Sequence, residues 1–375
     1  MTPQEHPTWL TALLADTRPP PKLFAWSPAN IQPKLDEGID MGSSNSDEEY
    51  DNDACVNPSP DSDQRIYIIG PGNIGRLPHY GPVKEVADGQ KLHNVFISTK
   101  AEAGLSEADR IRRYLGRCSS VVFAQNGVCK LWPPHGPLYI SHRYPSGETP
   151  TFSACVVSHG VASAGPFLSI HAAPADAYIG PVFWASGPES PGKQPLDYFF
   201  IRHIATTPLV NTKQVSSGEI WLLQLEKLVM NAAINPLTAL LRCKTGELFT
   251  SYDSDDPLTR VIDKLLWQAS IVIQGLIDHD TSRSVITSYA EQTSRLGTSC
   301  SVPKVRKKLM ERFSLPILKA KLYAFGLKIF EHRSSMLQDI EAGRKTEIRD
   351  FNGWIVDMAG FLGTDHDVKC AQGLN

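Results

Sequence analysis

The sequence lacks an apolar run of the roughly 18 residues that a membrane-spanning helix needs, so we predict no membrane partner. It also lacks an excess of either charge, since 37 lysines and arginines stand against 40 aspartates and glutamates. A net charge of −3 gives no field that attracts nucleic acid, and we predict no such partner. The seven cysteines are scattered without C-x-x-C spacing, so we expect no disulfide framework and no bound metal.

Arginine is scarce in the first residues, which instead contain Glu5 and Asp16. Mitochondrial presequences are rich in arginine and poor in acidic residues, so this composition argues against one. Scattered cysteines also suit a reducing compartment. We therefore predict a cytoplasmic protein, with the mitochondrion as the alternative.

A chain of 375 residues has room for two domains with cores of their own. Residues 36–64 are acidic and rich in serine, asparagine and proline, which predicts a disordered linker. Residues 1–35 form an N-terminal arm, in which "TWLTALL" favours a short helix and "KLFAW" an extended segment. After the linker we expect an α/β domain over 65–212 and an all-helical domain over 213–375.

The α/β domain opens on "RIYIIGPGNIGRL", an apolar strand that runs into Gly70, Gly72 and Gly75. Glycines at these spacings permit a tight turn and let the backbone approach a pyrophosphate at the start of a helix. Because the pattern directly follows a β-branched run, it favours a dinucleotide-binding turn over an ordinary strand-to-turn connection.

The segment after this turn is short for a complete dinucleotide site. Only 24 residues separate Gly75 from Lys100. A βαβ unit takes about 30 residues, so a second strand with an acidic residue or an arginine for the ribose has no room. We therefore predict a shortened cofactor-binding region, in which an internal segment has been lost or the cofactor half has decayed.

The rest of the α/β domain alternates strands and helices. Residues 93–100 and 119–127 are predicted strands with a helix between them, an order that indicates a parallel crossover. Ser106 and Asp109 have capping-box spacing, which predicts that this helix begins at Ser106. Residues 151–183 favour short strands with glycine turns.

The helical domain contains "LEKLVMNAAINPL", whose apolar spacing indicates a buried helix. Lys227 and Asn231 lie four residues apart on one face, and Asn235 closes the segment before Pro236. A lysine and two amides beside a buried stripe are unfavourable unless something uses them. The spacing leaves two interpretations open: a functional pocket, or a snorkelling lysine with an asparagine at a helix end.

A second stretch, "RSSMLQDIEAGRKTEIRDFNGWIV", contains signals for the start and end of one helix and the start of the next. Ser335 and Gln338 have capping-box spacing, Gly343 suits the position after a helix, and Thr346 is a plausible N-cap for the next helix. Glu347 is expected in the first turn of that helix, where the dipole favours a carboxylate.

Taken together, these motifs resemble the ketopantoate reductase (2-dehydropantoate 2-reductase) family in its longer fungal form, over nearly the whole chain. The resemblance is carried by "IYIIGPGNIGRL", "VFISTKA", "VVFAQNGV", "EKLVMNAAINPLTALL" and the "SSMLQD" to "TEI" segment. It implies a Rossmann-like domain followed by a helical domain of the 6-phosphogluconate-dehydrogenase-like kind. It also implies NADPH-dependent reduction of ketopantoate, a small 2-oxo acid, to pantoate on the route to pantothenate and coenzyme A, in a protein expected as a homodimer.

The resemblance also implies a role for each matching residue. Lys227 matches the catalytic lysine, whose ammonium would stabilise the developing alkoxide and donate a proton, and Glu347 matches the glutamate of the site. Asn231, Asn235 and Ser335 match substrate-binding residues. The matches to cofactor-binding residues are Gly70, Gly72, Asn73, Ile74, Gly75, Lys100 and Asn126.

Two alternative functions stay open at this point. One is a non-catalytic or cofactor-deficient scaffold that keeps the helical domain, which the short segment after Gly75 favours. The other is a reductase of another branched 2-oxo acid, because the apolar walls of a pocket are not identifiable from sequence.

Overall fold

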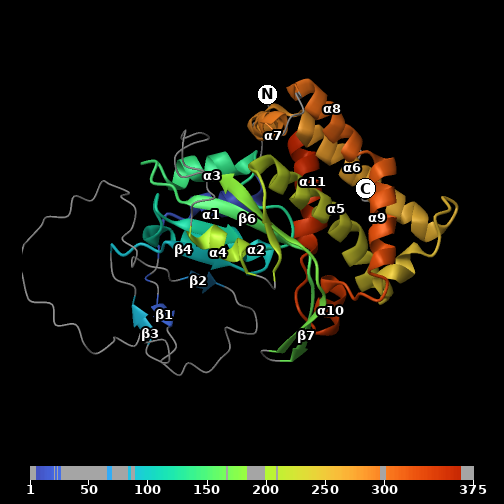
Figure 1. Cartoon of the computed structure of the whole chain (residues 1–375), viewed down its shortest axis with the longest axis horizontal. Coiled ribbons are helices and arrows are strands. Elements are labelled where there is room, and N and C mark those ends of the chain that lie inside the picture. The colour runs from blue at the N-terminus through green and yellow to red at the C-terminus, as the bar shows by residue number, and fades with distance from the viewer. Residues whose placement is uncertain are drawn as a thin grey trace, which may run out of the picture.

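The computed structural model describes residues 6–20, 22, 24–26, 66–69, 83–85, 89–165, 168–183, 199–207, 210–295 and 301–364. In this part of the chain a sheet with its covering helices forms one side of the molecule, and the helices of the second half gather on the other (Figure 1). The predicted disordered linker and the glycine turn lie outside the described residues.

The first domain is built on a six-stranded sheet with the order β10-β9-β6-β5-β4-β2. Neighbouring strands from β2 to β6 pair in parallel, β9 runs antiparallel to β6, and β10 is parallel to β9. The parallel crossover predicted between residues 93 and 127 is therefore confirmed. The strands are β2 (Ile66–Ile69), β4 (Asn94–Ile97), β5 (Ser120–Phe123), β6 (Thr151–Val157), β9 (Ala177–Phe183) and β10 (Thr212–Gln214).

Strand β2, which leads into the glycine motif, lies at the edge of this sheet. Within the described residues it pairs with β4 alone, and the side chains of Ile66 and Ile68 are 37% and 58% exposed. In a doubly wound sheet the first strand is central and further strands cover its other side. The edge position of β2 among the described strands is consistent with the predicted shortening of the cofactor-binding region.

Helix α2 (Ala101–Arg110) covers the sheet and begins five residues before Ser106, so the predicted start was wrong. Ser106 lies inside the helix, where its hydroxyl donates to the carbonyl of Ala103 at 2.8 Å. The N–H of Ala101, at the start of the helix, donates instead to the Glu347 carboxylate of the other domain at 3.2 Å. A cap supplied from so far along the chain leaves no local signal in the sequence.

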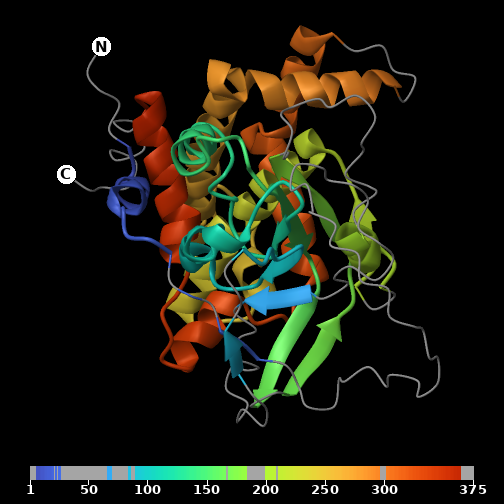
Figure 2. The same ribbon diagram turned by 90° about the vertical axis from the view of Figure 1, so that its left-hand side faces the viewer.

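The N-terminal arm forms the predicted helix, α1 (Thr8–Ala15), which packs on α3 (His135–Arg143) with Leu10 fully buried. In Figure 2 this helix lies beside the C-terminal end of the helical domain. The expected extended segment is strand β1 (Phe24–Trp26), which pairs antiparallel with β3 (Val83–Glu85).

Two further strands, β7 (Gly160–Gly165) and β8 (Leu168–Ala173), form an antiparallel hairpin that projects from the body of the molecule (Figures 1 and 2). The prediction of short strands over residues 151–183 is confirmed. Helix α4 (Phe199–Ala205) then leads to β10, whose pairing with β9 carries the sheet just past the boundary expected at residue 212.

The second domain is helical and is organised around α5, which packs against β6 and β9 and against α6, α7, α9, α10 and α11. No described helix, α5 included, is apolar over enough of its length to cross a bilayer. The helices are α5 (Ser217–Leu241), α6 (Pro257–Asp278), α7 (Arg283–Arg295), α8 (Val302–Arg312), α9 (Leu315–Lys328), α10 (Ser335–Glu341) and α11 (Ile348–Leu362). Short 3₁₀ turns occur at Arg112–Tyr114, Thr245–Phe249 and Asp280–Ser282.

Helix α5 runs through Pro236, so the prediction that the helix closes at Asn235 was wrong. Proline has no N–H for the carbonyl four residues earlier, which belongs to Ala232. The side-chain amide of Asn352 on α11 donates to that carbonyl at 3.1 Å. This replacement bond satisfies the buried acceptor and lets the helix continue.

The caps near α10 are shifted by one residue from the prediction. Ser334 caps α10 by accepting the Leu337 N–H at 3.1 Å, and Ser335 is the first helical residue. Gly343 follows the helix with a φ of +64°, as predicted. Helix α11 is preceded by Glu347 rather than Thr346, and no side chain caps it.

Candidate active site

A cavity of about 210 Å³ lies where β4, β5 and β6 end and α5 passes. Its wall includes Lys100 and Asn126 from the first domain and Lys227 and Glu347 from the second. The carboxyl ends of parallel strands are where open α/β sheets bind their ligands. Four residues singled out from the sequence therefore meet at one cavity between the domains.

Lys227 points from α5 toward the end of β6, where its ammonium donates to the carbonyl of Val157 at 2.5 Å. Burial lowers the pKa of Lys227 to about 8, against an opposing effect of Cys155 and Glu347. Desolvation has this effect because it disfavours the charged form of an amine. The result is a lysine that is fixed in place and able to exchange its proton near neutral pH.

Glu347 connects the two domains at the cavity. One carboxylate oxygen accepts the Ala101 N–H, and the other accepts the side-chain amide of Asn126 at 3.3 Å. Glu347 is only 8% exposed. Its contacts fix Asn126 and the start of α2 relative to Lys227.

The loop that carries Asn126 is shaped by its neighbours. Gly127 has a φ of +78°, and a Cβ at this position would lie 3.1 Å from the carbonyl of Asp350 on α11. Glycine therefore allows the loop to approach the second domain. Gln125 donates to the hydroxyl of Thr99 at 3.0 Å and also lines the cavity, a role that the sequence did not reveal. A polar residue directly after a buried strand was the available signal.

Lys100, expected to bind the cofactor, is held at the cavity rim by an acidic partner that we did not predict. Its ammonium lies 2.7 Å from the carboxylate of Asp339 on α10 and also donates to the carbonyl of Lys345. Asp339 is 7% exposed and accepts from Arg344 at 2.9 Å as well. A charged residue four positions after Ser335 gave the only hint in the sequence.

The Lys100–Asp339 pair is expected to stabilise the contact between the domains. Asp339→Asn should lower the free energy of unfolding by about 1–2 kcal/mol, less than a fully buried pair because Lys100 remains partly exposed. Denaturant titration measures this change. Glu102→Gln is the matched control, because the Glu102–Lys345 pair is 60% and 71% exposed and should contribute little. Equal effects of the two substitutions would contradict the assignment.

The predicted substrate-binding residues form a second group along α5. Asn235 is buried and its amide donates to the hydroxyl of Ser335 at 3.4 Å, a long bond. Asn231 lies between this pair and Lys227, one helical turn from each. Asn235 is about 12 Å along the helix from Lys227, so the two groups are neighbours on one helix rather than parts of one cluster. The five predicted residues of the glycine turn, 70 and 72–75, lie outside the described residues.

Two family models match this chain, one described as ketopantoate reductase PanE/ApbA over residues 76–183 and one as the C-terminal part of that family over residues 219–370. Together with the fold, they place the protein among oxidoreductases that join a Rossmann-like domain to a helical domain. The chain belongs to the ketopantoate reductase PanE/ApbA family, which confirms the resemblance found in the sequence.

Curated relatives carry two different activities in their names. "Ketoisovalerate reductase BEA2" of Gibberella fujikuroi is 79% identical, covering 100% of this chain and 96% of that protein. "Ketoisovalerate reductase" of Beauveria bassiana is 54% identical, with coverages of 100% and 96%. "Probable 2-dehydropantoate 2-reductase" of Schizosaccharomyces pombe is 31% identical, covering 73% of this chain and 71% of that protein. A solved structure of 2-dehydropantoate 2-reductase from Methylococcus capsulatus is 16% identical, with a TM-score of 0.49 and coverages of 76% and 74%.

The Gibberella fujikuroi relative is longer inside the aligned region. The alignment spans 432 positions, 57 more than the 375 residues of this chain. At least that many positions of the relative therefore lie opposite gaps within this chain.

Proposed function

We propose that the protein reduces the 2-oxo group of a branched 2-oxo acid, with ketoisovalerate as the substrate. The observation that carries the proposal is the Lys227 ammonium, held at a cavity between the domains beside Asn126 and Glu347. Two relatives named ketoisovalerate reductase, at 79% and 54% identity over the whole chain, favour this substrate over ketopantoate.

In this proposal Lys227 acts on the oxygen of the substrate carbonyl. A reduced nicotinamide supplies the hydride in such a reaction. As negative charge grows on the oxygen, the ammonium of Lys227 stabilises it and donates the proton that completes the hydroxyl. The Val157 carbonyl orients the ammonium, and the nearby Glu347 carboxylate favours its charged form. Asn231 and Asn235 are proposed to bind the substrate, and Ser335 its carboxylate.

The nicotinamide end of a cofactor suits the residues at the carboxyl ends of β4 and β5. Asn126 and Gln125 offer amides there, and Lys100 offers a cation at the rim. These residues would hold the amide and the ribose next to Lys227. The use of NADPH, a homodimer and a cytoplasmic location stay predictions from the sequence.

Ketopantoate is the second candidate substrate, favoured by the 31% identity to a probable 2-dehydropantoate 2-reductase. It differs from ketoisovalerate by one added hydroxymethyl group. We expect the purified chain to oxidise NADPH in the presence of ketoisovalerate with a kcat/KM at least about tenfold above that for ketopantoate. The reverse preference would reject the proposed substrate and keep the reductase. No turnover of either at millimolar concentrations would support the scaffold alternative.

The same assay, repeated across pH, tests the role of Lys227. The proton donor is the ammonium form, and the pKa of Lys227 is lowered to about 8. The rate of reduction should therefore be maximal below pH 8 and decline as the pH rises through that value. A rate that stays constant to well above pH 8 would remove Lys227 from the proton transfer.

A further inference from the structure

The first strand of the sheet has one side without a described neighbour. Beyond β2, in the part of the chain that the structure describes, no strand continues the sheet, and Ile66 and Ile68 expose apolar side chains on one face of this edge strand. In a complete dinucleotide-binding sheet the strand beyond the first one carries the group that binds the adenosine ribose. The edge location of β2 therefore affects the binding of the adenosine end of the cofactor and not that of the nicotinamide end.

The length of the chain after the glycine turn also concerns the adenosine end of the cofactor. The 24 residues between Gly75 and Lys100 include β3, which pairs with β1 in a separate small sheet. The Gibberella fujikuroi relative has at least 57 internal positions without a counterpart here. A βαβ unit takes about 30 residues, so the difference is large enough to contain a missing strand and its helices.

The cavity itself is small. At about 210 Å³ it is below the roughly 300–1,000 Å³ of pockets that bury a drug-sized ligand, and a dinucleotide is larger than that. Its polar groups lie at the carboxyl ends of β4 and β5, on α5, and at Glu347 just before α11. They surround the position of the reacting ring and leave the far end of a dinucleotide without described contacts.

We infer that this chain binds its cofactor through the nicotinamide half of the site. Among the described residues, polar groups surround the position of the nicotinamide and its ribose, and none is placed at the adenosine end. The inference rests on the proposed function, because it concerns the cofactor of that same site. It follows that the 2′-phosphate, which distinguishes NADPH from NADH on the adenosine ribose, goes unrecognised.

Equilibrium titration of the full chain tests this inference without relying on turnover. Binding of NADPH, NADH and reduced nicotinamide mononucleotide is followed by protein fluorescence, and adenosine 2′,5′-bisphosphate is added as a probe of the adenosine end. We expect the three dissociation constants to agree within about threefold, and the bisphosphate neither to bind nor to compete. Asn126→Ala should weaken all three by a common factor of about ten, whereas Lys264→Met, at an exposed position on α6, should change none.

Each other outcome has a distinct meaning. Binding of NADPH at least about tenfold tighter than the mononucleotide, with competition by the bisphosphate, overturns the inference and leaves the proposed reductase intact. Equal affinities that Asn126→Ala does not alter place binding away from this cavity, and overturn it too. If none of the three compounds binds, both the half-site and the proposed function are rejected.

Discussion

Replacing Lys227 by methionine is expected to lower the rate of 2-oxo acid reduction by about a thousandfold. Methionine fills similar space on α5 but has no ammonium to stabilise the oxygen or to donate a proton. The Val157 carbonyl would lose its donor at the cavity, while Asn126 and Glu347 would keep their own contact. Binding of reduced nicotinamide mononucleotide should therefore change far less than turnover, which steady-state kinetics and titration measure separately.

The same substitution is expected to stabilise the fold. A pKa lowered from 10.5 to about 8 means that the folded protein disfavours the charged lysine, at a cost of up to about 3 kcal/mol. An apolar side chain removes this cost, so the denaturant midpoint should rise as activity falls. Lys264→Met is the control, because Lys264 is exposed on α6 and should alter neither quantity. A variant with normal turnover, or with lowered stability, would contradict the assigned environment of Lys227.

Local patterns predicted most elements because their causes are local. The strand, helix and strand order fixed the parallel crossover, and apolar spacing indicated α5 and α1. The boundaries failed where a distant residue completes a hydrogen bond. Glu347 accepts the first N–H of α2, and Asn352 supplies the donor that Pro236 lacks, so neither boundary follows from the local sequence.

The candidate site also has a part that could be predicted from the sequence and a part that could not. Lys227, Asn126 and Glu347 could be chosen from the sequence through the family motifs, and the structure brings them to one cavity. The partners of the site lysines could not be chosen from the sequence. Asp339 contacts Lys100, and the Val157 carbonyl accepts from Lys227, across segments that are far apart in the chain. The short spacing after Gly75 indicated a missing segment, but the sheet order is needed to see that β2 lies at the edge of the described strands.

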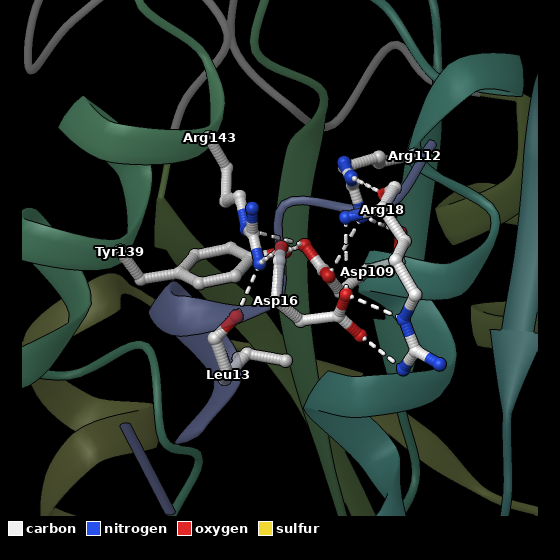
Figure 3. A network of polar contacts seen from close by, with 7 residues as sticks. All are labelled: Leu13, Asp16, Arg18, Asp109, Arg112, Tyr139 and Arg143. Carbon is white, nitrogen blue, oxygen red and sulfur yellow. Dashed lines mark hydrogen bonds and ion pairs between the residues drawn. The ribbon is translucent and has the colours of Figure 1, made fainter. Parts of the chain in front are cut away.

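Replacing Asp109 by alanine is expected to produce the largest loss of stability, about 3–5 kcal/mol. Asp109 lies on α2, where its carboxylate pairs with Arg112 at 2.8 Å and Arg143 at 3.1 Å and accepts from Tyr139 at 3.2 Å (Figure 3). Asp109 and Arg143 are each only 7% exposed. Removing the carboxylate would leave a buried guanidinium without a counter-charge, which chemical denaturation would detect.

This substitution should also release the N-terminal arm. Arg143 donates to the carbonyls of Leu13 and Asp16, at the end of α1, and Arg112 donates to that of Arg18 (Figure 3). Once Asp109 no longer holds the two arginines, α1 loses these bonds, and limited proteolysis should cleave the arm faster. Asp16→Asn is the control, because the Asp16–Arg18 pair is exposed and should leave both stability and cleavage unchanged. An arm that stays protected in the Asp109→Ala protein would show that apolar packing of α1 on α3 is sufficient to hold it.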